Sequence, residues 1–260
     1  MESYVNPYLT YTVNAIGTLN ILDSVKETKT VKSLICITSD KCYANNFSTK
    51  GFKENDKLGG EDPYSGSKAS AEIMINSYQK SFFNGLKCGV ASARAGNVIG
   101  GGDWSENRLI PDAINSIVNN KSIYIRNPNY NRPWQHVLEP LYGYLMLGKK
   151  IYNEPKKYSG PWNFGTKKNT VTNVLTIVKE IVKFWGKGKI NFKKNQKYYE
   201  QTNLQLNINK SIKFLKWQPK YSITKSIHVT TDWYKKVLVE KISAEKITTQ
   251  QIKDYMNESK

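Results

Sequence analysis

Cysteine is scarce in this sequence: Cys36, Cys42 and Cys88 are the only three among 260 residues. They are odd in number, they form no CxxC pair, and two of them lie in apolar stretches where a free thiol behaves as a small hydrophobic residue. This pattern argues against a disulfide framework and predicts a protein of a reducing compartment, the cytoplasm.

Long apolar runs are also absent. No stretch approaches the roughly 18 residues that a membrane span requires, and the opening segment from Met1 to Pro7 lacks the basic and then apolar layout of a secretory signal. The two histidines, His136 and His228, are far apart and have no cysteine at metal-ligand spacing. We therefore expect neither membrane insertion nor secretion, and no metal site.

Arginine is rare as well, although the chain is strongly basic, with a net charge of +18. Of its 39 basic residues four are arginine, which leaves 35 lysines. A basic chain can bind nucleic acid by releasing counterions from phosphates, but arginine is the side chain that best reads phosphates and guanine. No helix-turn-helix, zinc or RNA-binding signature is present. We expect a solvated basic surface, with nucleic-acid binding as a minor alternative.

The first part of the sequence alternates between helical and strand patterns. Apolar residues at helical spacing predict helices over 7–27 and 64–83, and short apolar runs predict buried strands over 31–39 and 88–94. Helix, strand, helix and strand in this order build a parallel sheet covered by helices. The predicted fold class is α/β, with a doubly wound parallel sheet.

The second half has a different pattern. Helices are expected over 109–118 and 171–185, and short strands over 122–126 and 189–192, which is a smaller mixed α+β arrangement. The boundary is expected near Gly100. The expected regions are a first domain at 1–100, a second at 101–240 with 132–170 partly returning to the first, and a lysine- and glutamate-rich surface tail at 241–260.

Residues that suggest chemistry lie where the first expected strand ends and the next helix begins. Ser39, Asp40 and Lys41 follow the strand, and Tyr64 and Lys68 stand four apart at the start of the helix. A tyrosine and a lysine at this spacing share one helix face, so the ammonium can lower the pKa of the phenol from about 10 and make it a usable base. Such a tyrosine can also be a helix-end aromatic packed on the sheet. Its pairing with Ser39 in a strand, loop and helix context favours the catalytic interpretation.

Longer motifs surround these residues. They are Thr38–Tyr43, Leu58–Lys68, Arg94–Trp104, Arg132–Pro140, Trp162–Gly165, Leu215–Pro219 and Trp233–Tyr234, spread over nearly the whole chain. In these motifs the sequence resembles the extended short-chain dehydrogenases/reductases, and within them the nucleotide-sugar 4,6-dehydratases of the CDP-glucose branch. The tyrosine and lysine are shared by the whole superfamily, whereas the central motifs are specific to this branch.

The resemblance implies an NAD-dependent lyase that converts CDP-glucose into CDP-4-keto-6-deoxyglucose. Tyr64 would be the base for the C4 hydroxyl, Lys68 would hold the cofactor ribose, and Ser39 would bind the C4 oxygen. Asp40 would be the acid at C6 and Lys41 the base at C5. Related dTDP-glucose dehydratases carry a glutamate in place of Lys41. Epimerases of the superfamily generally lack an acid directly after the serine, so Asp40 favours dehydration over epimerisation.

For the nucleotide part of the substrate, the resemblance points mainly to arginines. Arg132 and Arg108 are the expected pyrophosphate partners, because guanidinium donors match phosphate oxygens. Arg126 is a further candidate, and Asn97 is an expected contact at a strand end. The resemblance also implies a homo-oligomer.

One part of the family pattern is missing from the sequence. A dinucleotide fold opens with a strand, a glycine-rich turn and a helix, followed by an acid for the ribose, and none of these is found. The region 1–100 would thus be the later part of a Rossmann dinucleotide-binding domain, and 101–240 mainly the nucleotide-sugar domain. We expect the missing start to come from a complementary N-terminal chain or from a start placed upstream. An inactive fragment, a sugar-nucleotide-binding remnant, an epimerase and a basic nucleic-acid-binding protein are the alternatives.

Overall fold

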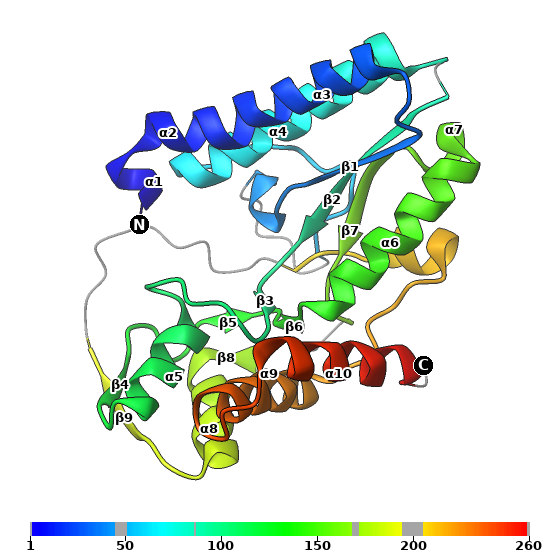
Figure 1. Ribbon diagram of the computed structural model, residues 1–260. Helices are drawn as coiled ribbons and strands as arrows, with labels where there is room; N and C mark the ends of the chain where they lie inside the picture. The colour runs from blue at the N-terminus through cyan, green and yellow to red at the C-terminus, as the bar shows by residue number, and fades with distance from the viewer. Residues whose placement is uncertain (1, 45–50, 86, 168–171, 194–204, 259–260) are drawn as a thin grey trace. The chain divides into compact units, whose positions relative to one another are not determined.

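The computed structural model describes residues 2–44, 51–85, 87–167, 172–193 and 205–258 (Figure 1). The chain divides into two compact units, each built from three separate segments. Unit 1 comprises Met1–Gly96, Pro140–Lys167 and Asn203–Gln218, and unit 2 comprises Asn97–Glu139, Lys168–Thr202 and Pro219–Lys260. Each unit has a hydrophobic core of its own.

Unit 1 is organised around a three-stranded parallel sheet in the order β1-β2-β7. Ala91 in the central strand pairs with Ile35 on one side and with Gly160 on the other. Among the described residues β1 pairs on one side only, so it forms an edge of this sheet. The strands are β1 (Ser33–Ile37), β2 (Gly89–Ala95) and β7 (Gly160–Phe164).

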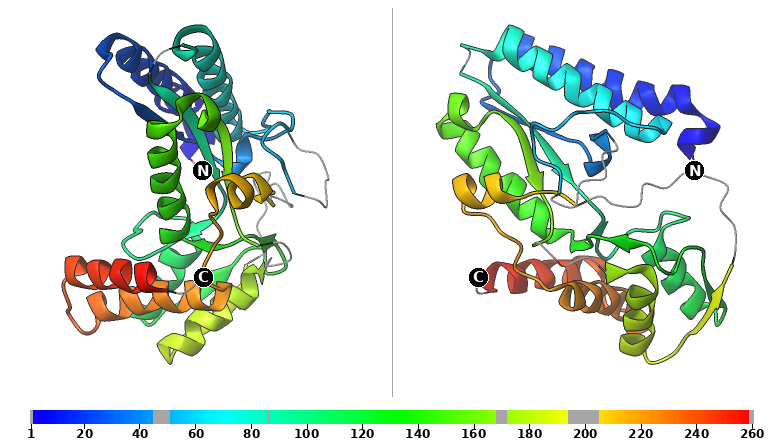
Figure 2. Two further views of the ribbon diagram at one scale, coloured as in Figure 1. Left: turned by 90° about the vertical axis from the view of Figure 1, so that its right-hand side faces the viewer. Right: turned by 180° about the vertical axis from the view of Figure 1, so that it is seen from behind.

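Helices cover both faces of this sheet, because successive strand residues point to opposite sides. Leu34 and Val90 share a core cluster with residues of α3 and α4, whereas Ile35 and Ala91 share one with residues of α6. Figure 2 shows α3 and α4 side by side along one face and α6 along the other. The predicted α/β class is confirmed. The helices are α1 (Glu2–Val5), α2 (Pro7–Tyr11), α3 (Gly17–Thr28), α4 (Pro63–Tyr78), α6 (Leu138–Asn153) and α7 (Pro155–Tyr158).

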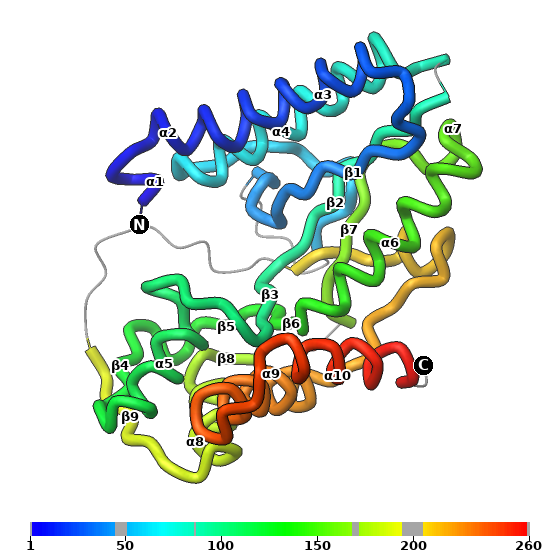
Figure 3. The backbone as a smooth tube through the Cα atoms, viewed as in Figure 1, coloured from blue at the N-terminus to red at the C-terminus, as the bar shows by residue number. Residues whose placement is uncertain are grey.

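The described part of unit 1 also contains three π-helical segments. The first, η1 (Thr12–Ile16), joins α2 to α3, so the helix expected over 7–27 is one continuous rod over residues 7–28 (Figure 3). The second, η3 (Gln79–Phe83), prolongs α4, and the third, η4 (Ser211–Leu215), lies in the last segment of unit 1.

The described residues of unit 2 form three small two-stranded sheets. They pair β3 (Val98–Ile99) with β6 (Gln135–His136), β4 (Ser122–Ile125) with β9 (Lys189–Phe192), and β5 (Asn131–Arg132) with β8 (Thr172–Asn173). Its core is rich in isoleucine, with Ile114, Ile177 and Ile181 all buried. The helices are α5 (Leu109–Val118), α8 (Val174–Trp185), α9 (Ile223–Leu238) and α10 (Ala244–Asn257).

The structure differs from the expected domains at two places. Residues 203–218 return to unit 1, because Trp217 is fully buried there beside Phe164. In the region expected to be a surface tail, α10 packs on unit 2 by one face and buries Ile247, Gln251 and Tyr255. These three residues stand four apart and form one helix face, which the surrounding lysines and glutamates conceal in the sequence.

Neither a membrane span nor a metal cluster is found in the part of the chain that the structure describes. None of the helices there combines the length and the apolar character needed to cross a bilayer. No group of three or more histidine, cysteine, aspartate or glutamate side chains there is placed to hold a metal ion.

Candidate active site

The first half of the candidate site is the segment that follows β1. Thr38 continues the strand ladder, since its backbone N–H donates to the carbonyl of Ala93 at 2.9 Å. Ser39 then caps the 3-10 turn η2 (Asp40–Cys42): its hydroxyl accepts from the backbone N–H of Lys41 at 3.2 Å and donates to Oδ1 of Asp40 at 3.1 Å. Thr38, Ser39 and Asp40 are buried. The turn thus fixes three predicted catalytic residues at the carboxyl end of a parallel strand, where α/β folds bind ligands.

The second half is the start of α4. Asp62 is the N-cap: its carboxylate accepts from the backbone N–H of Tyr64 at 3.0 Å and of Ser65 at 3.1 Å. Pro63 occupies the first turn, where its missing N–H is no loss. Tyr64 is therefore held in the first turn, and Lys68 lies one turn further on the same face. Both side chains are half-buried, so each keeps a surface open to a ligand.

The two halves meet at Lys41. Its ammonium nitrogen Nζ lies 5.9 Å from the centroid of the Tyr64 ring, which is cation–π range. Burial lowers the pKa of Lys68, and the negative charge of Glu72 opposes that shift. The five predicted catalytic residues thus stand on two adjoining segments of unit 1, the turn after β1 and the first two turns of α4.

A contact that the sequence did not predict holds the start of α4. The Asn14 amide donates to the Ser67 hydroxyl at 3.0 Å, and that hydroxyl donates to the carbonyl of Tyr64 at 2.7 Å. Tyr11 approaches Gly66 so closely that a Cβ at this glycine would lie 2.3 Å from the phenol oxygen. The N-terminal helical rod therefore sets the position of the turn that carries Tyr64. The glycine two residues after the predicted tyrosine was the available signal for this approach.

Behind the site lies a buried acid, Glu72, which the sequence patterns also left unnoticed. Its carboxylate accepts from the hydroxyl of Thr38, from the hydroxyl of Ser92 at 2.8 Å and from the guanidinium of Arg94 at 2.6 Å. Glu72 and Arg94 are 3% and 2% exposed. The available signal was the position of Glu72, one turn after Lys68 on the helix that carries the predicted base.

The residues predicted to bind the nucleotide all lie in unit 2. Arg132 on β5 is buried, and its guanidinium carbon lies 5.7 Å from the centroid of the Tyr130 ring. Asn97 precedes β3, and its side-chain nitrogen is buried with no hydrogen-bond partner within the described residues. These two residues have the desolvated polar groups that an oxygen-rich ligand can use.

The other two predicted nucleotide ligands are exposed. Arg108 stands at the start of α5, with its Nε 3.9 Å from a carboxylate oxygen of Asp103. Arg126 follows β4. An exposed guanidinium at that distance from a carboxylate is weakly ordered. The geometry therefore favours Arg132 and Asn97 over Arg108 and Arg126 as nucleotide ligands.

The residues present fit one end of NAD. Tyr64 and Lys68 stand at the carboxyl end of parallel strands, and the half-buried ammonium of Lys68 suits the ribose hydroxyls next to the nicotinamide. The pyrophosphate of a dinucleotide lies on a glycine-rich turn at a helix N-terminus. No such turn occurs in the 260 residues, which account for the nicotinamide-ribose end alone.

Comparison with known proteins places the chain in a family. The family described as GDP-mannose 4,6 dehydratase matches residues 1–230. The chain belongs to this dehydratase family. A CDP-glucose 4,6-dehydratase from Salmonella typhimurium is 41% identical to it over 239 residues, which are 90% of this chain and 67% of that protein.

Solved structures agree with this membership. The chain aligns with a dTDP-glucose 4,6-dehydratase from Bacillus anthracis in complex with NAD, with a TM-score of 0.72 and 25% identity over 87% of this chain and 68% of that one. It also aligns with a UDP-glucose 4-epimerase from Thermotoga maritima with a TM-score of 0.77 and 20% identity, covering 91% and 74% of the two chains. The epimerase likeness concerns the fold alone. The predicted resemblance and the Rossmann-like fold class are confirmed, and the residue roles stay predictions.

Proposed function

We propose that this member of the dehydratase family is an NAD-dependent lyase that converts CDP-glucose into CDP-4-keto-6-deoxyglucose. The observation that carries the proposal is the turn Ser39–Lys41 at the end of β1, with the Lys41 ammonium over the Tyr64 ring. The identity of 41% to a CDP-glucose 4,6-dehydratase supports the choice of substrate. We expect this activity only when the segment that binds the adenosine half of NAD is also present.

The first step is oxidation at C4 of the hexose. Tyr64 takes the proton of the C4 hydroxyl, and the Ser39 hydroxyl donates a hydrogen bond to the C4 oxygen. Lys68 holds the ribose hydroxyls of the cofactor and places a positive charge on the helix face of Tyr64. NAD, when bound, supplies a hydride acceptor for C4 and afterwards the hydride donor for C6.

The second step is loss of water across C5 and C6. The C4 ketone makes the C5 proton acidic, so that a base can remove it while an acid protonates the departing C6 hydroxyl. We assign the base to Lys41, which must be neutral at that moment, and the acid to Asp40, which is 4% exposed and hydrogen-bonded to Ser39. The C6 hydroxyl leaves as water with the proton from Asp40, Lys41 holds the C5 proton, and the oxidation state at C4 is unchanged in this step.

We assign the nucleotide of the substrate to unit 2. Arg132 and Asn97 would bind the pyrophosphate, since one offers a buried guanidinium and the other a buried amide nitrogen without a partner in the described residues. Arg108 and Arg126 are kept as further candidates that would have to turn toward the ligand. We also place the protein in the cytoplasm, in line with three cysteines that form no disulfide.

A surface of unit 1 suits the partner that would complete the cofactor site. Leu141, Leu145 and Tyr152 on α6 are 46%, 74% and 63% exposed and stand at helical spacing on one stripe. Gly148 lies on the same stripe, and a Cβ there would be 3.5 Å from Ile35 of the edge strand β1. The stripe therefore adjoins the edge of the sheet, where a further parallel strand can pair.

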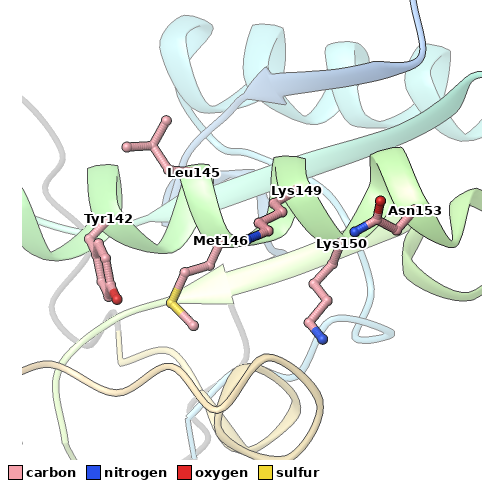
Figure 4. A pocket seen from close by; sticks show the side chains of 6 residues that line it. All are labelled: Tyr142, Leu145, Met146, Lys149, Lys150 and Asn153. Carbon is pink, nitrogen blue, oxygen red and sulfur yellow. The ribbon is translucent and has the colours of Figure 1, made fainter.

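A hollow of about 450 Å³ lies on the same helix (Figure 4). It is lined by Tyr142, Leu145, Met146, Lys149, Lys150 and Asn153. We infer that the stripe, the hollow and the edge of β1 receive a strand–turn–helix segment with the glycine-rich turn, whether on the same polypeptide or on a complementary chain.

A second apolar face suits a second copy of the chain. Tyr8 and Val13 on the N-terminal rod are 82% and 62% exposed, and Ile73 on the adjoining α4 is 59% exposed. α2 and η1 both pack against α4, so these exposed apolar residues stand on one packed group of helices. We propose that the chain self-associates through these residues.

Light scattering should give a mass that is a multiple of 29.7 kDa. A Tyr8→Lys, Val13→Lys variant should reduce this mass, whereas a Val118→Lys control in unit 2 should leave it unchanged.

The deciding experiment supplies the cofactor-binding part. The unmatched portion of the NAD-bound Bacillus anthracis enzyme is fused ahead of residue 1 or added as a separate chain, and CDP-glucose and NAD are then provided. A 4-keto-6-deoxy sugar should form, detected by its absorbance in alkali. The 260 residues without that portion should show no micromolar NAD binding in calorimetric titration. Formation of CDP-galactose without a keto sugar would make the epimerase alternative correct, and CDP-glucose binding without turnover would make the chain a sugar-nucleotide-binding remnant.

A further inference from the structure

Glu72 occupies an unusual position for an acid. It lies on α4 one turn beyond Lys68, and it is 3% exposed between the helix and the sheet of unit 1. Burying a carboxylate is costly unless donors surround it. The hydroxyls of Thr38 and Ser92 and the guanidinium of Arg94 provide these donors.

The donors come from the central strand and from the segment that carries the predicted catalytic turn. Thr38 directly precedes Ser39, while Ser92 and Arg94 lie on β2. Glu72 is itself on the helix of Tyr64 and Lys68. One carboxylate therefore joins the strand end, the central strand and the catalytic helix.

Arg94 extends this network to the third strand. Its guanidinium donates to the Tyr43 phenol at 2.7 Å and to the backbone carbonyl of Glu54 at 2.9 Å. The Tyr43 phenol donates to Oδ1 of Asn163 on β7 at 2.7 Å. The network thus crosses all three strands near their carboxyl ends and holds the chain on both sides of the catalytic turn.

We propose that Glu72 is the positioning residue of this site: it fixes the turn Ser39–Lys41 against the helix of Tyr64 and Lys68, and its charge balances that of Lys68. The assignment of catalysis to the residues it holds rests on the proposed function, whereas the positioning itself can be measured without turnover. Glu72 does not touch substrate in this role and acts through the groups that it binds.

The balance of charge has a simple cause. Burial lowers the pKa of Lys68, and the carboxylate of Glu72 one turn away opposes this effect. The other ionisable groups that interact with Glu72 are Arg94 on β2, Cys36 on β1 and Cys42 in η2. Of these, only Arg94 is a cation, and it pairs with Glu72 directly.

The test measures how fast the Lys68 amine reacts with an acylating reagent at a fixed pH, with mass spectrometry to identify the site. In Glu72→Gln the amine should react about threefold or more faster at pH 8 than in the unchanged chain, because a larger fraction is neutral. Glu27→Gln, at a glutamate whose side chain is 74% exposed, is the matched control and should leave the Lys68 rate unchanged. An unchanged rate in folded Glu72→Gln would overturn the charge-balancing role.

A second variant tests the positioning without altering any charge. Thr38→Val keeps the shape of the side chain but removes its donor to Glu72. Amide hydrogen exchange of residues 40–42 should become faster, while the Lys68 reaction rate stays as it was. Unchanged exchange in this segment would overturn the positioning role. If Glu72→Gln does not fold, Glu72→Gln with Arg94→Gln removes both buried charges and should still accelerate the Lys68 reaction.

Activity gives a third readout in the completed enzyme. Glu72→Gln should lower kcat at least tenfold with KM for CDP-glucose unchanged, because the nucleotide-binding candidates lie in unit 2. If kcat fell and KM rose by the same factor, the result would contradict the positioning role of Glu72. If the unchanged enzyme shows no dehydration at all, the proposed function fails, and the reactivity and exchange results still decide the inference about Glu72.

Discussion

Two regions of the molecule bury polar side chains in opposite ways. Around Glu72 in unit 1, both carboxylate oxygens accept hydrogen bonds inside the protein. In unit 2, Asn97 directly precedes β3, Trp134 directly precedes β6, and His136 lies on β6. A side-chain nitrogen of each is buried and has no hydrogen-bond partner in the part of the chain that the structure describes.

This difference separates a carboxylate whose two oxygens are both hydrogen-bonded within the protein from a region with several nitrogens suited to receive a ligand. A buried polar group without a partner costs about 1–3 kcal/mol, a cost that a ligand with oxygen acceptors can remove. The nitrogens of unit 2 are therefore expected to gain from binding. The groups around Glu72 are expected to keep their geometry whether or not a ligand is bound.

The largest expected effect is on the rate of the reaction at the turn and helix that Glu72 holds together. Tyr64→Phe should lower the rate of C4 oxidation in the completed enzyme by about 10²–10⁴-fold, because no base remains for the hydroxyl proton. Affinity for CDP-glucose should stay within about twofold, since the nucleotide-binding candidates lie in unit 2. Single-turnover absorbance in the NADH band measures the oxidation.

Asp40→Asn is the comparison variant for this experiment. It should leave C4 oxidation intact and slow the loss of the C6 hydroxyl, because the acid of the second step is removed. If Asp40→Asn lost the NADH band as fully as Tyr64→Phe, the division of roles between the two residues would be wrong.

The next effect concerns stability around Glu72. Arg94→Ala should reduce the free energy of unfolding by about 3–5 kcal/mol, because it leaves a buried carboxylate without its cation. Urea denaturation measures the loss. Arg108→Ala, at an exposed arginine 3.9 Å from its carboxylate, is the matched control and should cost less than about 1 kcal/mol. Equal losses would mean that burial of the pair has no energetic consequence.

A third effect should appear on acidification and belongs to unit 2. Burial lowers the pKa of His136 to about 4 from its ordinary value of 6.5. The unfolded chain therefore takes up a proton before the folded one does, so stability is present above pH 6.5 and is lost as the pH falls toward 4. The loss from this group should approach about 3 kcal/mol.

Chemical denaturation between pH 7 and pH 4 measures this dependence. His136→Gln should flatten the curve, whereas His228→Gln, at a histidine whose side chain is 38% exposed, should leave it unchanged. An equally steep curve in His136→Gln would assign the acid sensitivity to other groups.

The smallest expected effect tests the partnerless nitrogens directly. Asn97→Ala should weaken binding of CDP about tenfold and leave the free energy of unfolding unchanged or slightly higher, because its side-chain nitrogen gains no hydrogen bond on folding. Calorimetric titration with CDP measures the affinity, and Asn129→Ala, at an exposed asparagine of the same unit, is the control. A loss of stability without a loss of affinity would show that Asn97 is structural.

Sequence patterns identified the two segments predicted to be catalytic because both patterns are local. A short apolar run that ends in Ser39, and a tyrosine and lysine four apart after Pro63, depend on neighbours in the chain, and the structure places them at the end of β1 and the start of α4. Glu72 and Arg94 could not be paired in this way. Their partnership depends on how α4 packs on the central strand, which no local period records.

The same reasoning explains the errors in domain assignment. The sequence of the segment 203–218 does not indicate which unit it packs on. Trp217 packs against Phe164, which is far away in the sequence, so the assignment depends on a long-range contact. In α10 the buried stripe of Ile247, Gln251 and Tyr255 includes two polar residue types, so composition suggested a solvated helix. Tyr255 is buried because its phenol donates to the Glu139 carboxylate at 2.7 Å, again a long-range contact.

The division of unit 1 into three segments has a consequence for its folding during synthesis. The central strand β2 gains its second neighbour only when residues 160–164 have been made, and the core beside β7 is closed by Trp217. Contacts between residues so distant in sequence form slowly, since the intervening chain must first be ordered. Ala91 and Ala93 of β2 share their core with Phe164, Ile208 and Trp217, so this side of the central strand lacks much of its core until those later residues have been made. During that interval it is a candidate for chaperone binding.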